Sequence, residues 1–277
     1  MLSILHELES WSSMKQYSIA VCMSGQSRTW KTALPAIKRF FNSLKADVKF
    51  FGHTWDENTW RASSDHPGTT EKLCVETLRE ELQAAFNFER LIIDEQIHQF
   101  INGGKVLPWS AMLKSSAKSM HLKTQYEIET GRSFDMVYHV RFDFACSPHA
   151  YVDLTIPDVI EPDTVYCSRN SFAFEYRQPC IDDIFYYGSS RVMTMIDGFW
   201  HYYSNRRFHA LHNYNSTRNP TLDRYGVGVM LYKWVNDKCI KMVDIPRNIG
   251  PFVVRLGTEH LNWPLDHEAL RDAYRNF

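Results

Sequence analysis

The sequence lacks the features that mark several large classes of protein. Its 277 residues contain no apolar run approaching the roughly 18 residues of a membrane-spanning helix. Charge is balanced, because 31 Lys and Arg face 32 Asp and Glu, which leaves a formal net charge of -1. This balance argues against a nucleic-acid partner held by bulk charge, while a local basic patch and a peripheral membrane contact remain open. We expect a globular chain, since 44% of the residues are hydrophobic and 23% are charged.

The cysteines form neither a CxxC pair nor the spacing of a zinc site. Disulfide frameworks belong to short secreted chains, and the N-terminus carries Glu7 and Glu9 where a secretion signal needs apolar residues. We therefore expect reduced, buried thiols and a cytoplasmic location. The six residues concerned are Cys22, Cys74, Cys146, Cys167, Cys180 and Cys239.

The pattern of apolar residues predicts an α/β fold with a mostly parallel central sheet flanked by helices. Up to residue 145, strands and helices alternate, whereas prolines break the following part into a smaller, irregular C-terminal region. The predicted strands lie at 18–23, 47–55, 90–94, 134–144, 164–168, 184–188 and 239–245, and the helices near 33–44, 75–86, 109–129, 192–203, 221–235 and 266–274, with a polar loop at 56–70.

The first candidate site is the loop Ser24-Gly25-Gln26-Ser27-Arg28, which directly follows the first predicted strand. In open α/β sheets, ligands bind at the carboxyl ends of the strands. Gly25 allows the backbone to approach a ligand, and Arg28 can pair with a phosphate in a bidentate manner. The loop is neither GxGxxG nor a P-loop. The alternative interpretation is a tight turn with a surface arginine.

A second candidate site ends the second predicted strand. There Trp55 can stack on a base or ring, and Asp56 can accept a hydrogen bond from a hydroxyl group. Both would face the same sheet edge as the first loop. The alternative is a partly buried tryptophan that closes the strand.

The third candidate is Asp143, a single carboxylate at the end of a strongly apolar strand. A buried carboxylate needs a cation or strong hydrogen-bond donors. Arg141 lies two residues earlier, so the pleat places both side chains on one face. The pair is therefore either an Arg–Asp structural pair or part of a site in which Asp143 holds a divalent metal that bridges a diphosphate.

The succession of an apolar strand, the SGQxR loop, a strand ending HTWD and a strand ending RFD resembles glycosyltransferases of the GT-A, nucleotide-diphospho-sugar transferase type. Such sequences occur in viruses and bacteria among the genes for surface polysaccharides. The resemblance covers 17–145 well and 164–240 loosely. It implies a Rossmann-like GT-A fold, a nucleotide-sugar donor, a glycan or lipid-linked acceptor, and Mn²⁺ or Mg²⁺.

The resemblance also assigns roles to individual residues. Asp143 stands where the family's metal-binding DxD motif ends, but Arg141 occupies the first position of the motif. An alternative to the metal is therefore that Arg141 itself neutralises the diphosphate. The nucleotide pocket would be lined by Ser24, Gly25, Gln26 and Arg28, with Trp55, Asp56 and Arg141 completing the donor site.

The pattern along the chain, in which no linker-like stretch is found, predicts one compact domain: residues 1–16 as an N-terminal extension, 17–145 as the nucleotide-sugar-binding half and 146–277 as the acceptor-side half. Asp182 and Asp183 precede a predicted strand, and one of them would bind the acceptor or deprotonate its hydroxyl, as an inverting enzyme needs. The alternative for this pair is a solvated turn. Lys114, Lys118 and Lys123 are expected on a solvated helix face, the alternative being that one of them reaches a phosphate. His139 is expected to be a core or edge histidine.

The function that the sequence favours is transfer of a sugar to an acceptor hydroxyl, in the synthesis of a surface glycan. One alternative is a nucleotidyltransferase-like α/β enzyme, which would release pyrophosphate. Another is a non-catalytic nucleotide- or sugar-binding module, which the incomplete DxD motif supports. The sugar, the nucleotide, the stereochemistry and the oligomeric state stay open.

Overall fold

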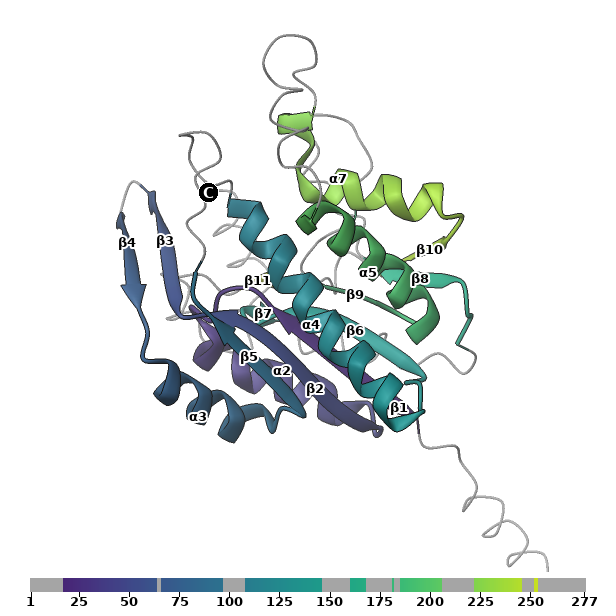
Figure 1. Cartoon of the computed structure of the whole chain (residues 1–277), viewed down its shortest axis with the longest axis horizontal. Helices are drawn as coiled ribbons and strands as arrows, with labels where there is room; N and C mark the ends of the chain where they lie inside the picture. Colours follow the sequence, from purple (N-terminus) through teal and green to yellow (C-terminus); the bar gives the residue numbers. More distant parts are fainter. Residues whose placement is uncertain are drawn as a thin grey trace, which may run out of the picture.

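The computed structural model describes residues 17–63, 66–96, 108–145, 160–167, 181, 185–205, 222–245 and 252–253. Its elements follow the predicted order of strands and helices closely (Figure 1). They are β1 (Ser18–Ser24), α2 (Trp30–Ser43), β2 (Asp47–Trp55), β3 (Glu57–Ser63), β4 (His66–Lys72), α3 (Val75–Phe86), β5 (Arg90–Asp94), α4 (Pro108–Thr130), β6 (Met136–Arg141), β7 (Phe144–Ala145), β8 (Thr164–Cys167), β9 (Phe185–Gly188), α5 (Ser190–Asn205), α7 (Leu222–Asp237), β10 (Lys241–Asp244) and β11 (Phe252–Val253).

The main sheet has seven strands in the order β10-β8-β9-β6-β1-β2-β5. Only β9 runs antiparallel to its neighbours, so six strands share one direction and the predicted, mostly parallel α/β sheet is confirmed. The carboxyl ends of those six strands therefore meet at one edge. The chain beyond residue 146 contributes β8, β9 and β10 to this same sheet.

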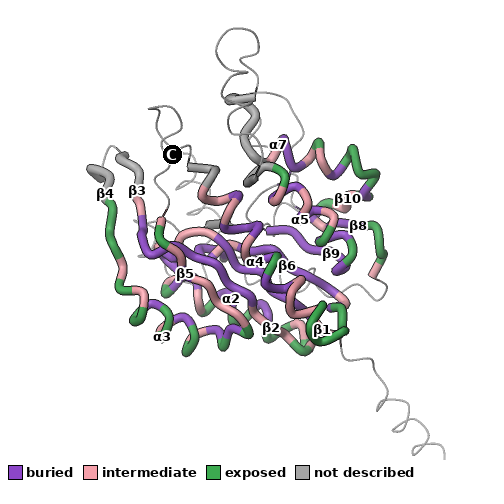
Figure 2. Tube along the Cα trace, in the orientation of Figure 1, coloured by how far each residue is buried: buried purple, intermediate pink, exposed green. Residues whose placement is uncertain are grey.

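Strand β1, next to the central strand β6, is buried on both faces because apolar residues occupy both sets of alternating positions. Ile19 and Val21 belong to a core shared with α2 and α3, whereas Ala20 and Cys22 belong to a second core shared with α4, α5 and α7. Figure 2 shows this layering, with buried strands in purple between partly exposed helices. The sheet thus holds α4 over the strands that carry the candidate site.

One side chain reinforces the register of β1 against β6 at their amino ends. Asp135 Oδ2 accepts hydrogen bonds from the backbone N–H and the hydroxyl of Ser18, each at 2.9 Å. In return the Asp135 N–H donates to the Ser18 carbonyl at 3.0 Å. These contacts reinforce the pairing that places Ser24 opposite Arg141 at the carboxyl edge.

Two predictions about these elements are wrong. The expected polar loop at 56–70 contains an antiparallel hairpin, formed by β3 and β4. Ile128, expected on the inner stripe of α4, is 75% exposed, while Leu113 and Met120 of the same stripe are buried. The predicted helix at 266–274 and the extension at 1–16 lie outside the described residues.

The four cysteines within the described ranges are free, as expected. Cys22 and Cys167 are buried, but Cys74 and Cys239 are exposed, so burial holds for only half of them. Among the described helices, none is both long and apolar enough to cross a membrane.

Candidate functional site

The loop after β1 is tied to both neighbouring layers. Gly25 has a φ of +103°, a conformation that favours glycine, and its N–H donates to Ser115 Oγ on α4 at 2.7 Å. Gln26 Oε1 accepts from the Thr59 N–H at 3.3 Å, and Arg28 Nη1 donates to the Thr59 carbonyl at 3.0 Å. Two residues predicted to bind the donor thus also hold the first residues of β3.

Two arginines share one buried carboxylate at the sheet edge. Arg141 donates from Nε and Nη2 to the two oxygens of Asp143, each at 2.8 Å, and Arg28 Nη2 lies 3.8 Å from Asp143 Oδ2. The Asp143 side chain is 3% exposed, against 22% for Arg28 and 18% for Arg141. The cluster carries two positive charges and one negative, and the positive groups are the more accessible ones.

This geometry is a poor fit to a divalent metal. Both Asp143 oxygens already accept hydrogen bonds from Arg141. Within the described part of the chain, no three His, Cys, Asp or Glu residues are grouped so that they could hold a metal ion. Mn²⁺ or Mg²⁺ therefore stays a prediction, and the described residues favour the alternative in which arginine supplies the positive charge.

Trp55 and Asp56 lie at the expected edge, but both have protein partners. Trp55 is buried and its ring packs edge-on against His53, with the ring centroids 4.8 Å apart. Asp56 accepts a hydrogen bond from the Gln96 N–H at 2.9 Å and pairs with the Lys72 ammonium at 2.6 Å. In this arrangement, neither the Trp55 ring nor the Asp56 carboxylate is free for a ligand. The donor-binding roles of the two residues stay predictions.

Beneath this edge, the predicted donor-binding residue Ser24 contacts two polar side chains, Ser116 and His139, that the sequence does not identify as part of the site. Ser24 Oγ, Ser116 Oγ and His139 Nε2 lie 3.1 to 3.2 Å from one another. Burial lowers the pKa of His139 to about 3, and the charge of Arg141 acts in the same direction. The predicted core position of His139 is confirmed. A signal was present in the sequence, because consecutive serines in mid-helix are disfavoured without such partners.

A second histidine flanks β1 on its other side. His53 lies within hydrogen-bond distance of Ser115 Oγ through Nδ1, at 2.8 Å, and of Asp94 Oδ2 through Nε2, at 3.1 Å. Asp94 also forms an ion pair with Lys118. Burial lowers the pKa of His53, whereas the hydrogen bonds that Asp94 accepts from His53 and Lys118 hold the pKa of this carboxyl well below its usual range.

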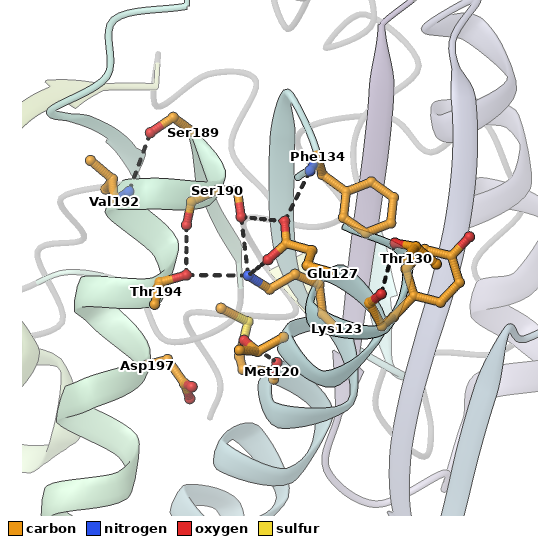
Figure 3. A network of polar contacts seen from close by, with 12 residues as sticks. Met120, Lys123, Glu127, Thr130, Phe134, Ser189, Ser190, Val192, Thr194 and Asp197 are labelled. Carbon is orange, nitrogen blue, oxygen red and sulfur yellow. Dashed lines mark hydrogen bonds and ion pairs between the residues drawn. The ribbon is translucent and has the colours of Figure 1, made fainter. Parts of the chain in front are cut away.

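The prediction of a solvated lysine face on α4 is wrong for Lys123, which is fully buried (Figure 3). Its ammonium donates to Glu127 at 2.8 Å, to Ser190 at 3.1 Å and to Thr194 at 3.2 Å. Glu127 Oε1 accepts from the Phe134 N–H at 2.9 Å and from the Ser190 hydroxyl at 2.6 Å. This network joins α4 to α5 and lies outside the candidate site.

Asp182 and Asp183 lie outside the described residues, so their catalytic role stays a prediction. The described strand that follows them begins at Phe185, which pairs with Val140 on β6. Of the other predicted site residues, Ser24, Gly25, Arg28, Arg141 and Asp143 meet at the carboxyl edge of β1 and β6.

No protein-family model matches the chain, and no curated protein matches it in sequence. Its structure is similar to those of glycosyltransferases. One is a glycosyltransferase involved in the glycosylation of the major capsid of PBCV-1, with a TM-score of 0.40, 7% identity and 84% of each chain covered. Another is apo-form GlyE from Streptococcus pneumoniae TIGR4, with a TM-score of 0.37 and 9% identity. The chain spans 46% of GlyE, and 84% of its own length is matched.

Proposed function

We propose that this chain is a glycosyltransferase, which moves a sugar from a nucleotide-diphosphate donor to an acceptor hydroxyl. The observation that carries the proposal is the cluster of Arg28, Asp143 and Arg141 beside the Gly25 loop. A buried carboxylate holds two partly exposed guanidinium groups at the carboxyl edge of a parallel sheet. Two guanidinium forks are well suited to a diphosphate, because each can donate two parallel hydrogen bonds.

In this proposal the arginines stabilise the leaving group. The bond between the sugar's anomeric carbon and the diphosphate oxygen breaks, and its electron pair stays on the diphosphate. The acceptor oxygen forms the new bond to that carbon, and Asp182 or Asp183 takes the acceptor proton in an inverting reaction. Asp143 orients the guanidinium groups, which neutralise the charge that develops on the leaving oxygen.

The setting of the reaction follows from the sequence resemblance. We propose a glycan or lipid-linked acceptor, a role in the synthesis of a surface glycan, and a cytoplasmic location. The free thiols of Cys22, Cys74, Cys167 and Cys239 are consistent with a reducing compartment.

A thermal-shift panel of UDP-, GDP-, CMP- and dTDP-sugars, with and without Mn²⁺, tests donor binding. One nucleotide class should raise the melting temperature of the wild type. Arg28→Met and Arg141→Met should lose this shift, whereas the control Arg191→Met should keep it. Arg191 is an exposed arginine on α5 that pairs with Asp163. Equal shifts in all three variants would contradict the site.

Product analysis then separates the candidate functions. A glycosyltransferase releases a free nucleoside diphosphate, and Asp143→Ala should abolish this release while the protein stays folded. Release of pyrophosphate would indicate a nucleotidyltransferase instead. The binding module is the second candidate, because Arg141 occupies both oxygens of the only carboxylate at the motif position. It predicts nucleotide binding without transfer under any metal.

A further inference from the structure

A chain of hydrogen bonds connects a surface ion pair to the loop after β1. It begins at Asp94, which pairs with Lys118 on the surface and with His53 Nε2 at 3.1 Å. It continues from His53 Nδ1 to Ser115 Oγ at 2.8 Å, and the Gly25 N–H donates to that hydroxyl at 2.7 Å. Because His53 and Ser115 have no exposed surface, they act on the loop rather than on a ligand.

The Ser115 hydroxyl can satisfy His53 in either protonation state. Its oxygen has one hydrogen to donate and two lone pairs to accept, one of which the Gly25 N–H uses. When His53 is neutral with its proton on Nε2 facing Asp94, Nδ1 accepts the hydroxyl hydrogen. When His53 is protonated, Nδ1 donates to Ser115 Oγ, and the hydroxyl donates to the His53 carbonyl, 2.9 Å away.

We propose that His53 is a positioning residue: Asp94 orients it, it fixes the Ser115 hydroxyl, and that hydroxyl holds the Gly25 amide and the loop Ser24–Arg28. The hydrogen bond to Gly25 persists through both protonation states of the ring, so the loop keeps its place while the charge beneath it changes. The consequence for nucleotide binding rests on the proposed glycosyltransferase function, but the positioning of the loop does not.

The charged groups that face His53 act on its pKa in opposite directions. Asp94 on β5 raises the pKa of His53, whereas the charge of Lys118 on α4 lowers it, as does burial. The Trp55 ring from the same strand packs against the imidazole and carries no charge. Lys114, one turn from Lys118, is the other lysine on this part of α4.

The first test follows the His53 ring by NMR as the pH is changed, with His53→Gln used to assign the signal. Asp94→Asn should move the inflection to lower pH, and Lys118→Met should move it to higher pH. If Asp94 and Lys118 only supported the fold, the two variants would not shift the His53 titration in opposite directions. Shifts in the same direction, or none, would overturn the role of Asp94.

The second test measures backbone hydrogen exchange at residues 24–30 in the free protein. Ser115→Ala and His53→Gln should speed exchange there about tenfold, the loss expected for one buried hydrogen bond. His53→Asn should preserve protection, because its shorter amide can occupy the Nδ1 position beside Ser115. The control is Ser119→Ala, a buried serine on the same helix that donates only to the Ser116 carbonyl.

Equal loop exchange in Ser115→Ala and the Ser119→Ala control would overturn the proposal. If Ser115→Ala does not fold, the comparison of His53→Gln with His53→Asn tests the proposal. Equal loop exchange in these two variants would also overturn it. Because the experiment uses no nucleotide, its failure differs from failure of the proposed function. Absence of any thermal shift with nucleotide sugars would refute the function and leave the positioning of the loop intact.

Discussion

At the scale of single residues, the candidate site depends on buried polar groups, of which most are paired while His139 Nδ1 and Ser27 Oγ have no hydrogen-bond partner within the described part of the chain. The sequence predicts that Arg141 faces Asp143, because the two lie at alternate positions of the expected strand; the structure has that pair, although β6 ends at Arg141 and Asp143 lies in the turn that follows. The consecutive serines on α4 indicate that polar partners are present, but the particular contacts of Ser115 and His53 could not be predicted, because their partners come from separate segments of the chain. The apolar periodicity of one segment does not indicate which polar side chains of another segment it contacts.

His139 makes the stability of the protein depend on pH. Its pKa in the folded protein is lowered to about 3 from an ordinary value of 6.5. The unfolded chain therefore binds more protons between these values, and the stability present above pH 6.5 is lost as the pH falls. We expect a slope of up to about 1.4 kcal/mol per pH unit from this residue.

Urea unfolding of wild type and His139→Gln between pH 7 and 4 measures this slope. The variant should be less stable at pH 7 but should show a shallower dependence on pH. The remaining slope has a contribution from His53, whose pKa is lowered by burial in the same direction. Parallel curves for the two proteins would contradict the assignment.

At the scale of elements, apolar periodicity predicted most helices and strands of the sheet, because each has a face that packs in a core. It failed where that relation breaks down. The hairpin β3–β4 has few apolar residues and carries Pro67, so its sequence is typical of a loop, although Thr59, Thr69 and Thr70 favour strands. The burial of Lys123 is not predicted, because its pairing with Glu127 is equally typical of an exposed helix face, and the α5 hydroxyls of Ser190 and Thr194 that complete its contacts are distant in sequence.

Substitutions in the buried network between α4 and α5 should have strongly non-additive effects on the free energy of unfolding. Lys123→Met leaves the Glu127 carboxylate without its cation, and we expect a loss of about 3 kcal/mol in unfolding free energy. The double variant Lys123→Met/Glu127→Gln should recover more than half of that loss, since no lone charge remains. Urea unfolding of the single and double variants tests this, and additive losses would be the contrary result.

At the scale of the whole molecule, the two predicted halves share one sheet. Strand β6 pairs with β1 on one side and with β9 on the other. His139 stacks on Tyr186 and Trp200, with ring centroids 4.6 and 5.5 Å away. The second core therefore contains side chains from both halves, which explains why no linker between them is visible in the sequence.

A chain ending at residue 145 should not fold to a stable monomer. It would expose the outer edge of β6 and remove α5 and α7, which cover one face of the sheet. We expect weak far-UV circular dichroism and uniformly fast hydrogen exchange for this fragment. A cooperative unfolding transition in the fragment would instead establish 17–145 as an independent domain.

The contact between Ser18 and Asp135 has a consequence for how the protein tolerates change. It aligns β1 with the central strand β6 at the end of the sheet opposite to the arginine cluster. Alignment and ligand chemistry are thus assigned to separate residues. We expect that the partly exposed polar groups at the carboxyl edge can be exchanged without sliding one strand past the other, so that new specificities would be accessible on the same scaffold.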